Sequence, residues 1–223
     1  LGVTMHVEAD NIRINPLTQI KPHHFVVEPD WSAASYFYSL LAITKQGSFK
    51  LPHFLSKSLQ GDAAIAAIYE HLGVYTQFYE EGVFLKTQET TIPEQLQIDL
   101  NNTPDIAQTL VVTCFGLGIA AHLTGLHTLR IKETDRLKAL KTELEKLGAT
   151  VKIGDDFLTL EARQTPITPN VRIATYSDHR MAMAFAPLSF LVPIEIENPH
   201  VVTKSYPTFW EDMKTLGMPV MFK

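Results

Sequence analysis

The most regular pattern of apolar and polar residues lies between residues 129 and 147. Its apolar positions recur at spacings of three and four, and they are Leu137, Leu140, Leu144 and Leu147. This spacing places them on one face of a helix, while the lysines and glutamates between them face water. The segment therefore predicts an amphipathic helix with Thr134 as its N-cap, Asp135 in its first turn and its end at Gly148.

The same patterns predict alternating strands and helices elsewhere. Two short strands are expected near the start, at 3–9 and 11–16. The elements expected next are a strand at 25–30, a helix at 31–44, a strand near 49, a helix at 60–73, and strands at 74–80 and 83–88. A second series has a strand at 96–100, a helix at 103–122, a strand at 127–131, a helix at 134–148, and strands at 149–155 and 157–163. A third series has a strand at 171–175, a helix at 178–191, a strand at 194–198, a helix from 206, and a strand at 219–223.

The order of these elements repeats. In each series a helix end is followed by Leu-Gly and strand residues, at 72–73, 147–148 and 216–217. A period of about 75 residues is too long for a solenoid and indicates a domain built from similar α/β units. We expect three βαβαββ units, with mixed sheets around helices, over about 25–88, 95–163 and 170–223, the third lacking its last strand.

The first residues fit the end of a further unit. Leu1, Gly2 and Val3 precede two strands, and no helix comes before them. We therefore expect residues 1–24 to be the trailing strands of an otherwise absent N-terminal domain, and residues 25–223 to be the C-terminal domain. The alternative is that residues 1–16 form an independent hairpin.

Composition limits the possible functions. The chain has 223 residues, 45% of them hydrophobic, which is enough for a substantial core. A formal net charge of -5 argues against a general nucleic-acid surface. Cys114 is the only cysteine and lies in an apolar run, so neither a disulfide framework nor a cysteine metal site is expected. No apolar run approaches the roughly 18 residues of a membrane span, and we expect a cytoplasmic protein.

Basic residues gather at the predicted helix starts, where a cation opposes the helix dipole. These residues are Lys132, Arg136, Arg180 and Lys204. Their recurrence at matching connections between strands and helices favours binding of phosphate and carboxylate groups. Asp105 and Glu133 lie beside them in the pattern and are candidates for proton transfer. Two alternatives remain: the charges around Glu133 form a solvated ion-pair cluster, or Asp105 only stabilises a helix dipole.

Other residues near these connections have supporting roles in the prediction. Asp178 is a candidate N-cap, and His179 is either structural or part of the site. Asp30 occupies the corresponding place in the first unit. We find no glycine-rich phosphate loop, nucleophile elbow or metal-ligand spacing. The pattern therefore indicates acid/base chemistry on an anionic small molecule, without a cofactor or metal.

Several segments together resemble the 5-enolpyruvylshikimate-3-phosphate synthase family. The resemblance extends over essentially the whole chain, and the segments that carry it are EPDWSAASYF, NNTPDIAQTL, RIKETDRLKALKTELEKLGATV, ATYSDHRMAMAF and VTKSYPTFWEDM. It implies an enolpyruvyl transferase of two domains, each with three βαβαββ units, which close on ligands in the cleft. The implied reaction transfers the enolpyruvyl group of phosphoenolpyruvate to the 5-hydroxyl of shikimate 3-phosphate and releases phosphate.

The resemblance also implies roles for individual residues. Asp105 would accept the proton of the 5-hydroxyl, and Glu133 would protonate the methylene carbon. The residues implied in substrate binding are Lys132 for shikimate 3-phosphate, and Arg136, Arg180 and Lys204 for phosphoenolpyruvate. Thr128 stands where the family often has an amide or imidazole that contacts the sugar, so this contact departs from the pattern.

Two other functions stay open on the sequence. One is an enolpyruvyl transferase acting on a nucleotide sugar, and the other is a non-catalytic α/β repeat scaffold. Because the N-terminal domain is expected to supply part of both substrate sites, we expect the isolated chain to be inactive.

Overall fold

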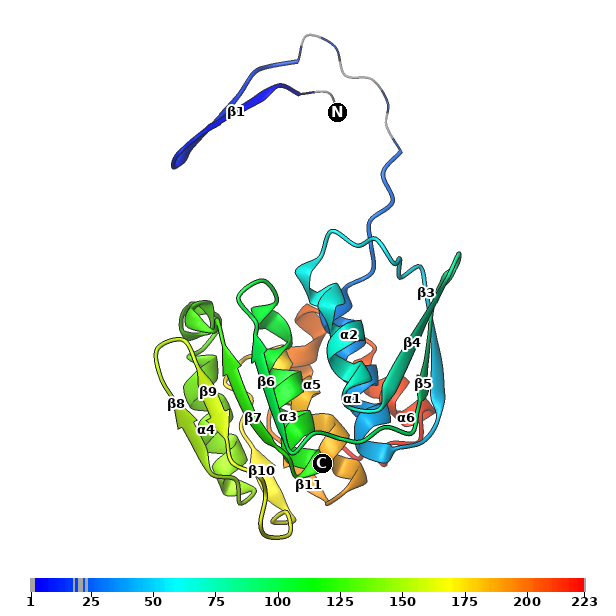
Figure 1. Ribbon diagram of the computed structural model, residues 1–223, viewed down its shortest axis with the longest axis vertical. Helices are drawn as coiled ribbons and strands as arrows, with labels where there is room; N and C mark the ends of the chain where they lie inside the picture. Colours follow the sequence, from blue (N-terminus) through cyan, green and yellow to red (C-terminus); the bar gives the residue numbers. More distant parts are fainter. Residues whose placement is uncertain (1–2, 18, 20–21, 23, 223) are drawn as a thin grey trace.

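The computed structural model describes residues 3–17, 19, 22 and 24–222. Its first elements are the strands β1 (Met5–Glu8) and β2 (Asn11–Ile14), which pair in antiparallel register. All eight of their residues are exposed, and the hairpin lies apart from the body of the protein in Figure 1. The two strands predicted within 3–16 are therefore confirmed. Their assignment to another domain stays a prediction, and Leu1 and Gly2 lie outside the described residues.

The second unit has the complete βαβαββ order. It contains β6 (Gln95–Asp99), the 3₁₀ helix η2 (Pro104–Ile106), α3 (Ala107–Leu117), β7 (Ala120–Thr124), the 3₁₀ helix η3 (His127–Ile131), α4 (Arg136–Lys146), β8 (Val151–Ile153) and β9 (Leu158–Leu160). Its sheet order is β6-β7-β9-β8, with β6 and β7 parallel and the other pairs antiparallel. The mixed sheet expected for a unit is confirmed here.

The first unit repeats most of this arrangement. It contains α1 (Trp31–Thr44), β3 (Ser48–Pro52), the 3₁₀ helix η1 (Gly61–Ala64), α2 (Ile65–Glu70), β4 (Val74–Tyr79) and β5 (Gly82–Thr87). The order β3-β5-β4 corresponds strand for strand to β7-β9-β8, because each middle strand pairs antiparallel with both neighbours. The repeat deduced from the sequence is thus also present in strand order.

The third unit is shorter. It contains β10 (Val171–Ile173), α5 (His179–Phe185), the 3₁₀ helix η4 (Ala186–Phe190), β11 (Ile194–Ile196), the 3₁₀ helix η5 (Pro199–Lys204) and α6 (Phe209–Thr215). β10 and β11 pair in parallel, as β6 and β7 do. The predicted strand at 219–223 is wrong for residues 219–222, which are not in a strand, and Lys223 lies outside the described residues. No described strand pairs with them, and a strand needs such a partner to satisfy its backbone groups.

The helices α1, α3 and α5 pack against one another in the middle of the body, and the sheets lie towards its outside in Figure 1. Their shared surface is largely apolar, and several of its hydroxyl side chains bond one another. Ser35 and Thr109 are 2.9 Å apart at their hydroxyls, and Thr113 donates to Ser39 over 2.8 Å. Because these hydroxyls are buried, their mutual hydrogen bonds avoid the penalty of unpaired polar groups.

The predicted strand at 25–30 is absent. Phe25, Val26 and Val27 are 79–85% exposed, so their apolar side chains contribute little to the core. The next residues are held by side chains instead of a sheet: Glu28 accepts hydrogen bonds from Ser58 Oγ and Leu59 N. No described strand lies alongside this segment, which explains why its alternating pattern does not give a strand.

The end of α3 was predicted too late. The helix ends at Leu117 because Gly118 adopts a left-handed conformation with φ of 81°, where its N–H bonds the carbonyl of Phe115. The following apolar residues form β7 beside β6, and residues 127–131, predicted as a strand, form η3. A buried apolar run fits both a helix and a strand, so the glycine was the informative signal.

Candidate functional site

Arg136 is the centre of a group of charged side chains at the helix starts. This charged cluster consists of Asp105, Lys132, Glu133, Arg136, Asp178, Arg180 and Lys204. Its guanidinium donates from Nε to Asp178 Oδ2 over 2.7 Å, from Nη1 to Asp105 Oδ1 over 3.1 Å and from Nη2 to Glu133 Oε2 over 2.8 Å. The side chain of Arg136 is 2% exposed and that of Asp178 is fully buried. A solvated ion-pair cluster is therefore wrong for Arg136, whose unfavourable place in the first turn of α4 is offset by three carboxylates.

Arg180 approaches Asp105 from α5. It donates from Nη1 to the backbone carbonyl of Asp105 over 3.0 Å and from Nη2 to the carboxylate over 3.2 Å. Its Nη2 also lies 3.3 Å from Ser32 Oγ, whereas the buried Nε has no hydrogen-bond partner. Asp105 thus lies between two arginines from two different helix starts.

Two lysines complete the charged cluster. Lys132 Nζ lies 3.3 Å from Asp105 Oδ1, and Lys204 Nζ lies 2.7 Å from Glu133 Oε1. The side chain of Lys204 is 61% exposed, so this pair is open to water. The structure therefore brings all four predicted cations together with Asp105 and Glu133, and each cation has a carboxylate partner within the protein.

N-caps fix the three helices that carry or adjoin the charged cluster. Asp30 accepts from Ser32 N at the start of α1, and Asp178 accepts from Arg180 N at the start of α5, both over 2.8 Å. The predicted N-cap Thr134 is wrong, because Asp135 caps α4 by accepting from Lys138 N over 3.2 Å. The cap falls one residue later, so Arg136 is the first helical residue, and Asp135 serves the backbone instead of the charged cluster.

Thr128 and His179 are less directly involved. Thr128 lies in η3, and its buried hydroxyl has no hydrogen-bond partner. His179 begins α5, and its Nδ1, also unpartnered, lies 3.9 Å from Asp178 Oδ1. Burial, reinforced by Arg180, lowers the pKa of His179, so its imidazole is neutral at pH 7.

The surrounding cations keep both candidate acid/base groups ionised. The hydrogen bond from Lys204 lowers the pKa of Glu133 to about 2, with Arg136 acting in the same direction. Partial burial acts to raise the pKa of Asp105, but Arg180, Lys132 and Arg136 outweigh it and hold the pKa below its ordinary value. In this state Asp105 is ready to accept a proton, whereas Glu133 has none to donate.

Replacing Lys204 with methionine is expected to raise the pKa of Glu133 towards its ordinary value. The hydrogen bond from Lys204 is the largest cause of the depression, and the charge of Arg136 remains. In the parent chain the contribution of Glu133 to the free energy of unfolding is present above pH 4.5 and is lost as the pH falls towards 2. In the variant this contribution is smaller, so stability falls less over the same pH range. Carboxyl NMR titration measures the change. Lys152→Met is a control elsewhere on the surface, because Lys152 pairs with exposed Glu161. An unchanged midpoint for Glu133 in Lys204→Met would contradict this assignment.

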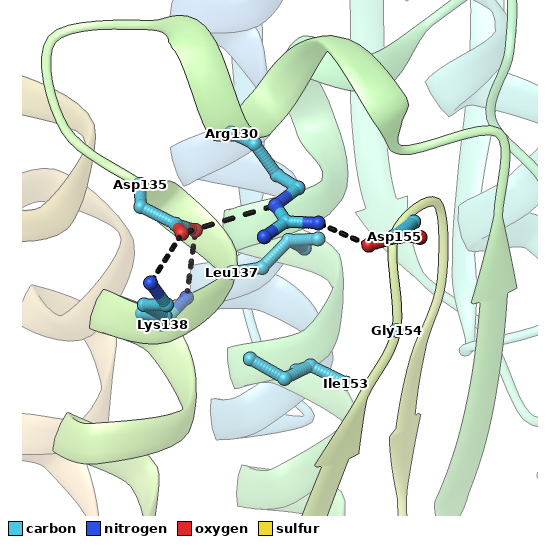
Figure 2. Close-up of a pocket in the computed structure, with 7 residues that line it drawn as sticks. All are labelled: Arg130, Asp135, Leu137, Lys138, Ile153, Gly154 and Asp155. Carbon is cyan, nitrogen blue, oxygen red and sulfur yellow. Dashed lines mark hydrogen bonds and ion pairs between the residues drawn. The ribbon is translucent and has the colours of Figure 1, made fainter.

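A separate hollow of about 150 Å³ lies beside the start of α4. Figure 2 shows Arg130 between Asp135 and Asp155, so that it joins the N-cap of α4 to the turn between β8 and β9. None of the predicted site residues lines this hollow. The ion pairs of Arg130 stabilise the position of α4, and the candidate site lies outside this hollow.

The described residues include no group of three or more histidine, cysteine, aspartate or glutamate side chains arranged to hold a metal ion. None of the helices among them is long and apolar enough to cross a membrane.

Sequence reasoning missed Ser32, which contacts Arg180 in the charged cluster, and also Asp62 and Thr103, which lie beside it. Ser32 Oγ donates to Asp62, and Thr103 Oγ1 donates to the same carboxylate over 2.7 Å. A signal was present, because Asp62 follows Gln60-Gly61 at the helix start that corresponds to that of α4 in the repeat. Serine and threonine are common at helix starts, so their presence at positions 32 and 103 did not indicate a contact with Asp62.

Solved structures with the same architecture are enolpyruvyl transferases. The fold matches an EPSP synthase from Acinetobacter baumannii with a TM-score of 0.74, at 21% identity, over 97% of this chain and 52% of that chain. It also matches the enolpyruvyl transferase NikO from Streptomyces tendae with a TM-score of 0.67, at 15% identity, over 97% and 50% of the two chains. These similarities define the fold class.

Sequence comparison identifies the family. The model of the family EPSP synthase (3-phosphoshikimate 1-carboxyvinyltransferase) matches residues 1–213. A 3-phosphoshikimate 1-carboxyvinyltransferase from Bacteroides fragilis is 43% identical over 94% of this chain and 51% of its own length, and one from Pasteurella multocida is 34% identical over 85% and 42%. The chain belongs to the EPSP synthase family, and it spans about half the length of the curated relatives that it matches.

Proposed function

We propose that this chain is the C-terminal half of an enzyme that transfers the enolpyruvyl group of phosphoenolpyruvate to the 5-hydroxyl of shikimate 3-phosphate. The observation that carries the proposal is the pair of carboxylates, Asp105 and Glu133, which share the guanidinium of Arg136 and each contact a lysine. Family membership supports the reaction. An N-terminal half would supply the remaining substrate contacts, and the same proposal places the enzyme in the cytoplasm.

The chemistry requires a base and an acid close together. In the addition step Asp105 takes the proton of the 5-hydroxyl as its oxygen bonds the central carbon of phosphoenolpyruvate, and Glu133 gives a proton to the methylene carbon. In the elimination step phosphate leaves with the proton that Asp105 took up, and Glu133 takes back a methyl proton, which restores the double bond. The lowered pKa of Asp105 leaves its carboxylate ionised, which is the form that can accept a proton.

The cations have separate tasks in this proposal. Lys132 binds shikimate 3-phosphate, and Thr128 lies at the place of a sugar contact. Arg136, Arg180 and Lys204 hold the phosphate and carboxylate of phosphoenolpyruvate. When an anionic substrate draws Lys204 away from Glu133, the main cause of the low pKa of Glu133 is removed. Substrate capture thereby raises the pKa of Glu133 and makes it easier to protonate.

Phosphate release measures the proposed reaction. This chain joined to, or mixed with, the N-terminal half of a relative is expected to release phosphate only when both substrates are present. Formation of the enolpyruvyl ether, followed by NMR, distinguishes transfer from hydrolysis of phosphoenolpyruvate. No release by the completed enzyme would contradict the proposed function.

The chain by itself is expected to release no phosphate from the two substrates. The charged cluster supplies candidate acid, base and cations, but the proposal assigns part of both substrate sites to the other half, so the reactants are not held in position. The measurement is the same phosphate assay at high concentration of the isolated chain. Turnover comparable to that of the completed enzyme would show that this half is sufficient.

A further inference from the structure

Asp62 joins three helix starts that belong to two units. It lies in η1, and its carboxylate accepts hydrogen bonds from Ser32, in the first turn of α1, and from Thr103, which precedes η2. Thr103 is buried and stands two residues before Asp105. One side chain outside the proposed substrate contacts therefore joins Ser32, which contacts Arg180, to the segment that carries Asp105.

The hydroxyl of Ser32 has one proton, and its geometry fixes where that proton goes. Ser32 Oγ donates to Asp62 Oδ2, so the oxygen of Ser32 has only lone pairs for its second neighbour. That neighbour is Arg180 Nη2 at 3.3 Å, which also donates to Asp105 Oδ2 at 3.2 Å. Asp62 thus makes Ser32 an acceptor that holds one end of the Arg180 guanidinium.

Backbone packing keeps this connection tight. A Cβ atom at Gly61 would lie 2.0 Å from the carbonyl oxygen of Asn102, so only glycine permits the observed approach of the two segments. The residues that follow Gly61 and Asn102 are Asp62 and Thr103. The distance between the Asp62 carboxylate and the Thr103 hydroxyl is therefore set by backbone contact as well as by their hydrogen bond.

We propose that Asp62 is a positioning residue, which acts through Ser32 on Arg180 and through Thr103 on the segment that carries Asp105. The proposal rests on the function proposed above, since Arg180 is assigned to phosphoenolpyruvate and Asp105 to the 5-hydroxyl. Asp62 itself contacts neither substrate.

The substitution Asp62→Asn tests this role in the completed enzyme. Ser32 bonds Oδ2 of Asp62 and Thr103 bonds Oδ1, so an amide in the same place has an oxygen for only one of them, and the other hydroxyl must turn its proton elsewhere. We expect the KM for phosphoenolpyruvate to rise about tenfold. Ser32→Ala is expected to raise the same KM, and the double variant to resemble Asp62→Asn, because both changes break one chain of contacts. Asp99→Asn is the matched control, since exposed Asp99 accepts only from the nearby backbone N–H of Asn101, and its KM is expected to stay within twofold.

A second readout separates this proposal from the proposed function. In the ligand-free chain, the side-chain NMR signal of Arg180 Nε is expected to move in Asp62→Asn and to stay unchanged in Asp99→Asn. If the completed parent enzyme is inactive, the function fails, and the Arg180 signal alone decides the role of Asp62. An unmoved signal, or a lowered Tm with an unchanged KM in an active enzyme, would overturn the positioning role.

Discussion

Replacing Arg136 with methionine is expected to lower the free energy of unfolding by about 3–5 kcal/mol. The substitution fills similar space with apolar atoms but removes the cation that partners fully buried Asp178. Asp178 keeps its backbone hydrogen bond from Arg180 N, yet its charge would have no salt-bridge partner among the arginines described. Removing one member of a buried pair leaves the desolvated charge of the other uncompensated, which is the source of the large effect.

Denaturant unfolding of the isolated chain measures this loss. Arg130→Met is the control, because Arg130 pairs with Asp135 and exposed Asp155 near the same helix start, and a solvated pair contributes about 0–1 kcal/mol. Arg136→Lys keeps the charge but loses the planar fork, so its stability is expected to lie between the parent and Arg136→Met. Equal stability of the Arg136 and Arg130 methionine variants would contradict the buried-pair interpretation.

Replacing Glu133 with glutamine is expected to lower turnover of the completed enzyme at least 100-fold, a size typical of the loss of a general acid. Glutamine keeps an oxygen that can accept from Arg136 Nη2 or Lys204 Nζ, the two groups that bond Glu133. It cannot release a proton to the methylene carbon. We therefore expect kcat to fall much more than the KM for either substrate changes.

Steady-state kinetics with both substrates measures the effect. Glu145→Gln serves as the control, because it removes a carboxylate from an exposed pair with Lys141 within α4. Its rate is expected to equal that of the parent. A fall of less than tenfold in Glu133→Gln would rule out proton donation by Glu133, and the proposed assignment of the acid would then have to move.

The helix of residues 136–146 was predictable because its leucine spacing and its Gly148 end agree with each other. The clustering of Arg136, Arg180, Lys132 and Lys204 was predictable for a different reason: a repeat places equivalent helix starts at equivalent places. What the cations contact was not predictable, because the sequence gives no distance between Arg136 and Asp178, which are 42 residues apart. The expectation of a ligand for Arg136 therefore overlooked partners within the protein.

The errors in the fold have a common cause. Residues 25–27 and 219–222 have apolar side chains suited to strands, but a strand also needs backbone partners, and none of the described strands supplies them. The run from Ala107 to Thr124 is largely apolar and contains no charged residue, so Gly118 was the main signal that separates helix from strand. The local sequence pattern indicated which segments have side chains suited to strands. Whether a segment pairs as a strand depended on distant parts of the chain.

The carboxylates bonded to the cations also act as tethered competitors of any bound anion. A tethered group has an effective concentration on the order of millimolar or higher, so a free anion must exceed that local supply to take its place. Chloride or a simple monocarboxylate offers one charge and gains one contact. A ligand that carries both a phosphate and a carboxylate replaces several protein contacts at once. In the proposed site, selectivity for polyvalent anions would thus arise from the exchange at Arg136, Arg180 and Lys204, before any other part of the ligand is recognised.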